Sequence, residues 1–101
     1  MCLFFIFLGL GLFANHVISK GDFVIEFVGE VIDDELLLIR KQRYTDQRRT
    51  CLYFMKVHQG NIDAMTFGNE SRFINHSCDP NCQTQKWLVS RVGVYSYFYI
   101  Y

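Results

Sequence analysis

A chain of 101 residues is long enough for a single domain with one hydrophobic core. Hydrophobic residues make up 50% of the chain and aromatic residues 17%, which excludes a disordered protein. Ten Lys and Arg balance ten Asp and Glu, so net charge gives no argument for non-specific binding to nucleic acid.

The chain begins with an apolar run, MCLFFIFLGLGLFA, that is similar to the apolar part of a signal peptide. The run has no positively charged start and no small-x-small cleavage pattern at its end. Its apolar length is also below the roughly 20 residues that a membrane-spanning helix needs. We therefore expect one or two buried strands, interrupted by Gly9 and Gly11, and no membrane partner.

Residues 16–33 predict two short strands and a turn. The Lys-Gly-Asp sequence at 20–22 is a turn signal, and FVIEFVGEVI is rich in the β-branched and aromatic residues that favour strands. Gly29 lies inside that run, where glycine indicates either a bulge or a close approach between backbones.

Residues 33–44, DDELLLIRKQRY, predict a helix. Asp33 or Asp34 can cap its N-terminus, and basic residues near its last turn complement the helix dipole.

The following segments are expected to be an exposed loop at 45–50, a strand at 51–57, a turn at 58–61, a strand at 62–67, a single helical turn within 71–76, and strand from 84 onwards. Many short strands and no alternation of strands with helices predict a mainly β domain with a small helical insert.

The stretch RFINHSCDPNC, residues 72–82, contains residue types that suit three kinds of site. His76 and Cys78 could form a nucleophilic couple, although such couples usually come from distant parts of a chain. Cys78, Cys82 and His76 are suitable zinc ligands, but a closed zinc site has four ligands and a fourth is not evident nearby. Asn75, in a tight bend, could bind a polar small molecule without performing chemistry.

The chain has four cysteines: Cys2, Cys51, Cys78 and Cys82. An even number in a short chain leaves open the alternative of a secreted protein with two disulfides, which the mass of the intact protein would test. Otherwise Cys51 and Cys82 are expected to be buried, reduced side chains that act as small hydrophobic residues.

Five pieces of the chain resemble, in their order, the SET domain of protein lysine methyltransferases. They are GLGLFA (9–14), EFVGEVID (26–33), YFM (53–55), IDA (62–64) and GNESRFINHSCDPNCQTQKW (68–87). The resemblance implies a SET-domain-like β-clip fold. The NCQTQKW segment is most similar to the group that modifies histone H3 at lysine 36, the SET2-like, nuclear SET-domain and Ash1-like enzymes.

The resemblance also implies where S-adenosylmethionine binds. The backbone of residues 9–11 would pass close to the cofactor, where glycine leaves no Cβ in the way. Asn75 and His76 would hold the cofactor, so His76 would not be a general base. The full set of implied cofactor residues is Gly9, Leu10, Gly11, Cys51, Leu52, Tyr53, Asn75, His76 and Gln85.

One residue is implied to face the reaction itself. Tyr53 matches the family position at the wall of the lysine channel, on the cofactor-facing strand that includes Cys51 and Leu52. An aromatic channel favours the uncharged lysine that attacks the methyl group, because desolvation disfavours an ammonium ion. Gln85 would touch the adenine.

The sequence departs from the family at both ends. RVGVYSYFYIY stands where the family has a segment of the type Glu-Leu-Thr-Phe-Asp-Tyr, so none of its tyrosines is given the catalytic role of that segment. Cys78 matches a family zinc ligand whose partner cysteines come from a tail that this sequence lacks, so zinc is expected only with such a tail. We therefore expect a partial SET domain at 9–96, truncated at the C-terminus, with divergent apolar ends at 1–8 and 97–101.

The function implied by the resemblance is that of a histone-lysine N-methyltransferase. It would transfer a methyl group from S-adenosylmethionine to a lysine of histone H3, lysine 36, in the nucleus and on chromosomes. The expected partners are the histone H3 tail and the nucleosome, without direct sequence-specific binding to nucleic acid. The alternative is a catalytically incomplete SET fragment that acts as a chromatin- or peptide-binding module.

Overall fold

The computed structural model describes residues 2–6, 9–58, 60–90 and 93–100. The chain forms two compact units, which we call the terminal unit (Met1–Phe27 with Phe73–Tyr101) and the central unit (Val28–Arg72). Strands dominate the terminal unit, whereas the central unit combines three short strands with the one α-helix of the described part of the chain, in agreement with the mainly β fold with a small helical insert that the sequence predicts.

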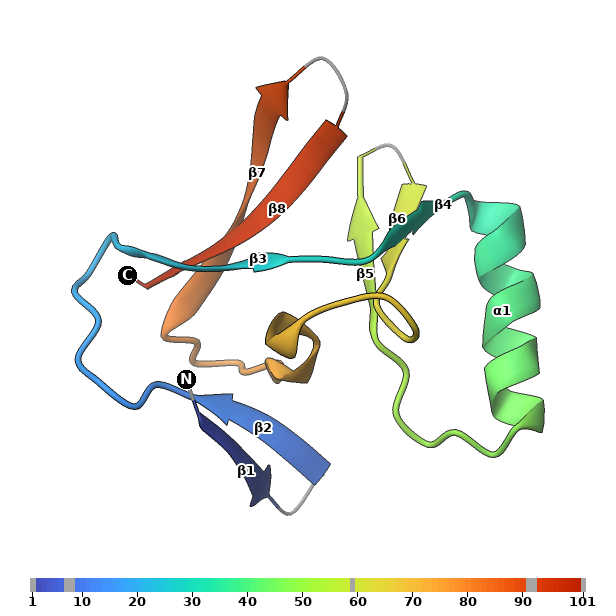
Figure 1. The fold of residues 1–101 in the computed structure, drawn as a ribbon, viewed down its shortest axis with the longest axis horizontal. Coiled ribbons are helices and arrows are strands. Elements are labelled where there is room, and N and C mark those ends of the chain that lie inside the picture. The colour runs from blue at the N-terminus through green and yellow to red at the C-terminus, as the bar shows by residue number, and fades with distance from the viewer. Residues whose placement is uncertain (1, 7–8, 59, 91–92, 101) are drawn as a thin grey trace. The chain divides into compact units, whose positions relative to one another are not determined.

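The terminal unit contains a hairpin and a three-stranded sheet. Strands β1 (Cys2–Ile6) and β2 (Gly9–Phe13) pair antiparallel, so the apolar start of the chain does form strands. Its two glycines lie within β2 and do not interrupt it. The sheet has the order β3 (Phe23–Phe27), β8 (Gly93–Ile100), β7 (Cys82–Ser90) (Figure 1). Because β8 is the middle strand, the aromatic end of the chain is paired on both sides.

The central unit contains a second sheet, in the order β4 (Glu30–Ile32), β6 (Gly60–Asp63), β5 (Phe54–Val57). Strand β4 can lie against β6 only because residue 29 is glycine. A Cβ atom there would be 2.5 Å from the backbone oxygen of Asp63 and 2.6 Å from Cγ2 of Ile62. The prediction of a bulge or a close approach is therefore resolved as a close approach. The two expected strands of residues 16–33 are β3 and β4, both after the turn at 20–22.

Helix α1 (Asp34–Asp46) begins where the sequence predicts. Asp33 is its N-cap, and Oδ1 of Asp33 accepts a hydrogen bond of 2.7 Å from the Leu36 N–H. The helix ends two residues later than expected, since the sequence predicts a loop from Thr45 and α1 continues to Asp46. The Thr45 hydroxyl donates to the Lys41 carbonyl oxygen at 2.9 Å, and this bond ties the first of the two extra residues to the helix.

Aromatic contacts join α1 to the sheet of the central unit. The ring of Tyr44 lies 6.1 Å from the ring of Phe54, and the Lys41 ammonium stands 5.8 Å from the centre of the same Phe54 ring. Together with this buried tyrosine, the core of the central unit consists of Ile32, Val57, Ile62, Ala64 and Met65.

The strands of the β5–β6 hairpin are shorter than the sequence predicts. Strand β5 starts at Phe54, so residues 51–53 precede it, although the Ala64 N–H still donates to the Tyr53 carbonyl oxygen at 2.9 Å. Strand β6 ends at Asp63, where the carboxylate accepts a hydrogen bond from the Met65 N–H and turns the chain away from extended geometry. The expected helical turn is present as a short 3-10 helix, Glu70–Phe73.

None of the helices found among the described residues has the length and apolar character needed to cross a membrane.

The cap of α1 can be tested by Asp33→Ala. We expect the free energy of unfolding to fall by about 1 kcal/mol, because the Leu36 N–H loses its side-chain acceptor. Urea unfolding followed by circular dichroism measures the change. Asp33→Ser keeps an oxygen acceptor and should retain most of the stability, so equal losses in both variants would contradict the capping role.

Candidate functional site

Two segments that are far apart in the sequence meet in the terminal unit. The side-chain amide of Asn75 donates through Nδ2 to the carbonyl oxygen of Leu10 at 3.5 Å, across 65 positions of the chain. Leu10 lies at the centre of the Gly-Leu-Gly sequence in β2, and Gly11 beside it is buried. The structure thus brings the glycine segment and the asparagine of the Asn-His pair into one place.

The bend that follows Asn75 leaves its polar side chains accessible. Asn75, His76 and Cys78 are all exposed. Cys78 Sγ lies 4.0 Å from His76 Nε2, and the Ser77 hydroxyl oxygen accepts a hydrogen bond of 3.1 Å from the Asp79 N–H. A ligand at β2 could therefore contact both an amide and an imidazole. Gln85 is also exposed and lies on β7, opposite Tyr97 of β8.

The other expected site residues belong to the central unit. Cys51 and Leu52 are exposed and Tyr53 is half-buried. The Tyr53 N–H donates to the sulfur of Met65 at 3.2 Å, and the Tyr53 carbonyl accepts from Ala64, so its backbone is held on both sides. Burial, followed by the neighbouring Cys51, raises the pKa of the Tyr53 phenol. The phenol is therefore protonated at neutral pH.

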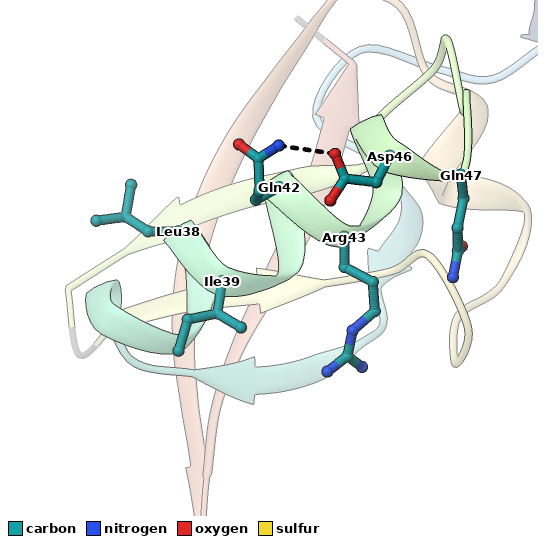
Figure 2. Close-up of a pocket in the computed structure, with 6 residues that line it drawn as sticks. All are labelled: Leu38, Ile39, Gln42, Arg43, Asp46 and Gln47. Atoms are coloured by element: carbon teal, nitrogen blue, oxygen red, sulfur yellow. Dashed lines mark hydrogen bonds between the residues drawn. The ribbon is translucent and has the colours of Figure 1, made fainter.

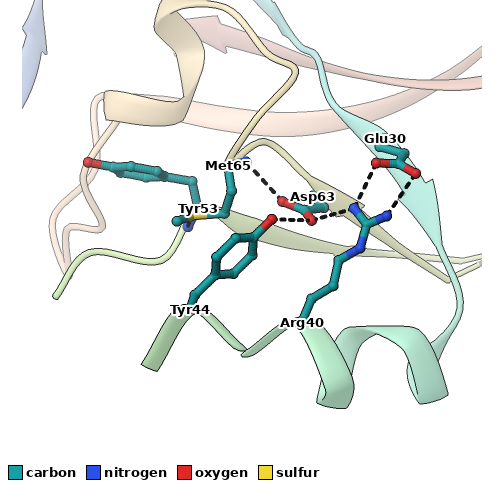
Figure 3. Close-up of polar contacts among 6 residues, drawn as sticks. All are labelled: Glu30, Arg40, Tyr44, Tyr53, Asp63 and Met65. Carbon is teal, nitrogen blue, oxygen red and sulfur yellow. Dashed lines mark hydrogen bonds and ion pairs between the residues drawn. The ribbon is translucent and has the colours of Figure 1, made fainter. Parts of the chain in front are cut away.

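Sequence reasoning missed a buried polar network beside this segment. Asp63 is 2% exposed, and its Oδ2 accepts from Arg40 Nη1 at 2.8 Å and from the Tyr44 hydroxyl at 3.3 Å (Figure 3). Its Oδ1 accepts from the Met65 N–H at 2.9 Å. The available signal was a carboxylate placed between Ile62 and Ala64, because a buried acid needs partners.

Arg40 joins this network to β4. Its guanidinium binds both oxygens of Glu30, with distances of 2.7 Å from Nη1 and 2.9 Å from Nη2. The hydrogen bonds from Arg40 hold the pKa of Glu30 below its usual value, and those to Glu30 and then to Asp63 raise the pKa of Arg40. A two-pronged guanidinium contact of this kind fixes both distance and direction.

The comparison with protein families decides the classification. The SET domain family model matches residues 9–100. The chain belongs to the SET domain family. Its fold is that of a SET domain, as the sequence resemblance implies.

Curated relatives of this SET domain carry the name histone-lysine N-methyltransferase. Set2 of Drosophila melanogaster and NSD3 of Mus musculus are each 47% identical over 92 residues, which is 87% of this chain. A protein of Debaryomyces hansenii named as H3 lysine-36 specific is 41% identical over 92 residues, again 87% of this chain. The chain spans only 4%, 6% and 13% of the lengths of these three relatives.

Solved structures show the same fold. The polycomb repressive complex 2 of Chaetomium thermophilum contains a chain that matches 92% of this SET domain with a TM-score of 0.82 and 33% sequence identity. A second structure, of ctPRC2 in an autoinhibited conformation bound to S-adenosylmethionine, matches 93% with a TM-score of 0.80 and 32% identity. In both, the match covers 12% of the other chain.

The cysteines of this SET domain do not assemble a zinc site in the part of the chain that the structure describes. No group of three or more His, Cys, Asp or Glu side chains gathers there as metal ligands, and Cys78 has only His76 beside it. Cys51, Cys78 and Cys82 are free thiols, so the alternative with two disulfides does not hold. Cys82 is half-buried, and burial raises the pKa of its thiol, whereas the expectation that Cys51 is buried is wrong. Cys51 is exposed because it precedes β5.

An open depression on α1 lies outside the expected site. Figure 2 shows its lining, in which Leu38 and Ile39 stand beside polar side chains of the second half of the helix. All of its lining residues come from α1 and its C-cap, so it is a shallow surface of one element and not an enclosed cavity.

The contact between Arg40 and Glu30 predicts a pH dependence. The folded-state pKa of Glu30 lies below the ordinary value of 4.5, so its stabilisation is present above that value and is lost as the pH falls through the folded-state pKa. Glu30→Gln should therefore be less stable than the native chain at about pH 7, and the difference in stability should be smaller at about pH 3. Urea unfolding at both pH values measures the difference.

Glu70→Gln, at an exposed position in the short 3-10 helix, is the control. A gap between native chain and Glu30→Gln that stayed constant with pH would contradict the ionic contribution of this pair.

Proposed function

We propose that this SET domain is the catalytic domain of an S-adenosylmethionine-dependent histone-lysine N-methyltransferase that modifies histone H3 at lysine 36. The observation that carries the proposal is the hydrogen bond from Asn75 to Leu10, because it joins the glycine segment to the Asn-His pair. The names of the curated relatives and the S-adenosylmethionine in a matching structure support it. The histone H3 tail on a nucleosome is then the partner, and nuclear chromatin the location.

The side chains of the terminal unit suit the amino acid end of this cofactor. The Asn75 amide, oriented by its hydrogen bond to Leu10, can accept from an ammonium group through its oxygen. The exposed imidazole of His76 offers a further polar contact and a flat face beside it. Gly9 and Gly11 let a ligand approach the β2 backbone without meeting a Cβ atom. Gln85, on the same unit, is proposed to contact the adenine.

Residues 51–53 of the central unit are proposed to face the cofactor, and Tyr53 is proposed to face the substrate lysine as well. When bound, S-adenosylmethionine supplies a methyl group on a positively charged sulfur, open to attack by a neutral amine. Tyr53, a neutral phenol at about pH 7, would line the lysine channel and offer a hydroxyl group to the amine. Such a wall disfavours the charged form of lysine through desolvation. Holding two reactants in line can lower the activation barrier by roughly 7 to 11 kcal/mol.

A second candidate is a binding module that keeps the cofactor contacts without turnover. It is favoured by one sequence observation, that no tyrosine after Val94 stands in a segment of the type Glu-Leu-Thr-Phe-Asp-Tyr. The two candidates share the cofactor site and differ in catalysis, so binding and turnover must be measured separately.

Calorimetric titration of the chain with S-adenosylmethionine tests the cofactor site. Asn75→Ala should raise the dissociation constant roughly tenfold or more, because it removes both the contact to Leu10 and the amide offered to the ligand. Asn15→Ala is a matched control, since Asn15 is also exposed, lies in the same unit and bonds only its neighbour His16 in the contacts described. Native binding absent at millimolar cofactor, or equal effects of the two variants, would overturn the site.

Methyl transfer from radiolabelled cofactor to nucleosomes tests the activity. We expect incorporation into histone H3 that is lost on nucleosomes in which lysine 36 is replaced by arginine. Tyr53→Ala should lower the rate by about 100-fold, because it removes the proposed channel wall and a hydrogen-bonding group. Cofactor binding without incorporation would instead favour the binding module.

A further inference from the structure

The buried network of the central unit leads directly to Tyr53. Asp63 Oδ1 holds the Met65 N–H at 2.9 Å, and the Met65 sulfur in turn accepts the Tyr53 N–H at 3.2 Å. Between them, the Ala64 N–H donates to the Tyr53 carbonyl at 2.9 Å. The N–H and the carbonyl oxygen of Tyr53 are therefore both hydrogen-bonded to residues of the three-residue turn Asp63–Met65. Figure 3 shows the Tyr53 ring beside Met65, on the side away from Arg40.

Arg40 fixes the other end of the same carboxylate. It comes from the middle of α1, is 18% exposed on its side chain, and binds Asp63 and Glu30 at the same time. The Tyr44 hydroxyl, one helical turn further on, donates to the same Asp63 oxygen. The helix thus supplies two donors to an acid that is almost completely buried.

We propose that Arg40 and Asp63 are positioning residues for Tyr53, which transmit the placement of helix α1 through the Asp63–Met65 turn to the lysine-channel tyrosine. The importance of Tyr53 for the reaction rests on the proposed function, whereas the connection itself is a property of the central unit. Because all the residues of the network belong to this unit, the connection does not depend on how the terminal unit is placed.

The chemistry of the Arg40 and Asp63 contacts explains how the position of helix α1 can determine the position of Tyr53. A buried carboxylate without partners is strongly disfavoured, so Asp63 keeps its donors and its orientation is determined by them. The guanidinium fork at Arg40 allows one direction of approach, whereas a lysine ammonium would allow many. Replacing the fork by a single charge should therefore loosen the turn without leaving the acid unpaired.

The test compares three variants of the full chain. Arg40→Lys keeps the charge and removes the fork, and Met65→Leu removes the sulfur acceptor with little change in volume. Lys56→Met is the matched control, because it breaks an ion pair of the same unit, with Asp34 at 2.5 Å, whose side chains are 64% and 74% exposed. Thermal unfolding establishes that each variant is folded. If Arg40→Lys is not folded, Tyr44→Phe replaces it by removing one donor from the same carboxylate.

Two measurements on Tyr53 do not depend on activity. Hydrogen exchange of the Tyr53 amide should become roughly fivefold to tenfold faster in Arg40→Lys and Met65→Leu, and should not change in Lys56→Met. The pKa of the Tyr53 phenol, followed by NMR of carbon-13-labelled tyrosine, should fall toward its ordinary value in the same two variants because the ring becomes better hydrated. Folded variants in which neither quantity changes would overturn the proposal.

Kinetics separate positioning from general stability. Arg40→Lys should lower kcat for methyl transfer, and it should have little further effect in a Tyr53→Phe background. An equal loss of kcat in both backgrounds would show that Arg40 does not act through Tyr53. A chain without any turnover would contradict the proposed function alone, since the two NMR measurements would still decide the connection.

Discussion

A carboxylate that is removed from water must find donors, and in the central unit Asp63 finds them on three different parts of the chain. Arg40 and Tyr44 reach it from the helix, and the Met65 N–H reaches it from the turn that follows β6. This requirement determines which face of α1 points toward the sheet, where β6 ends and how the backbone before β5 is held. Ile62, Ala64 and Met65 of the apolar core lie next to Asp63 in the chain, so the core and the polar network share one segment.

The terminal unit is organised by backbone pairing. Strand β8 lies between β3 and β7, so both neighbours depend on the last strand of the chain. A side-chain hydrogen bond from Asn75 to Leu10 links the hairpin to the bend after the 3-10 helix. One long-range hydrogen bond thus holds Asn75 beside the glycine segment in the terminal unit. In the central unit, the charged network around Asp63 holds the backbone of Tyr53, the proposed channel residue. A substitution in one unit is therefore expected to leave the contacts of the other unit intact.

The sequence predicted features that depend on local chemistry or on the resemblance to the family. A cap at Asp33 or Asp34 was predictable because capping is decided within four residues, and the structure selects Asp33. Gly29 indicated either a bulge or a close approach, and the short distances to β6 select the close approach. The end of β6 was not predictable, because a hydrogen bond from the Met65 N–H to the Asp63 carboxylate bends the chain within a segment of high strand propensity. The network around Arg40 was missed because its partners lie 10 and 23 positions away, and no local pattern encodes such pairing.

The absence of a Cβ atom at residue 29 has a consequence for the gene as well as for the fold. The space that any other side chain would enter is already occupied by the backbone of the neighbouring strand, which cannot rotate aside as a side chain can. In a library that samples all amino acids at this codon, selection for folded protein should therefore retain glycine alone. Every glycine codon begins with two guanines, so only changes at the third base would escape that selection.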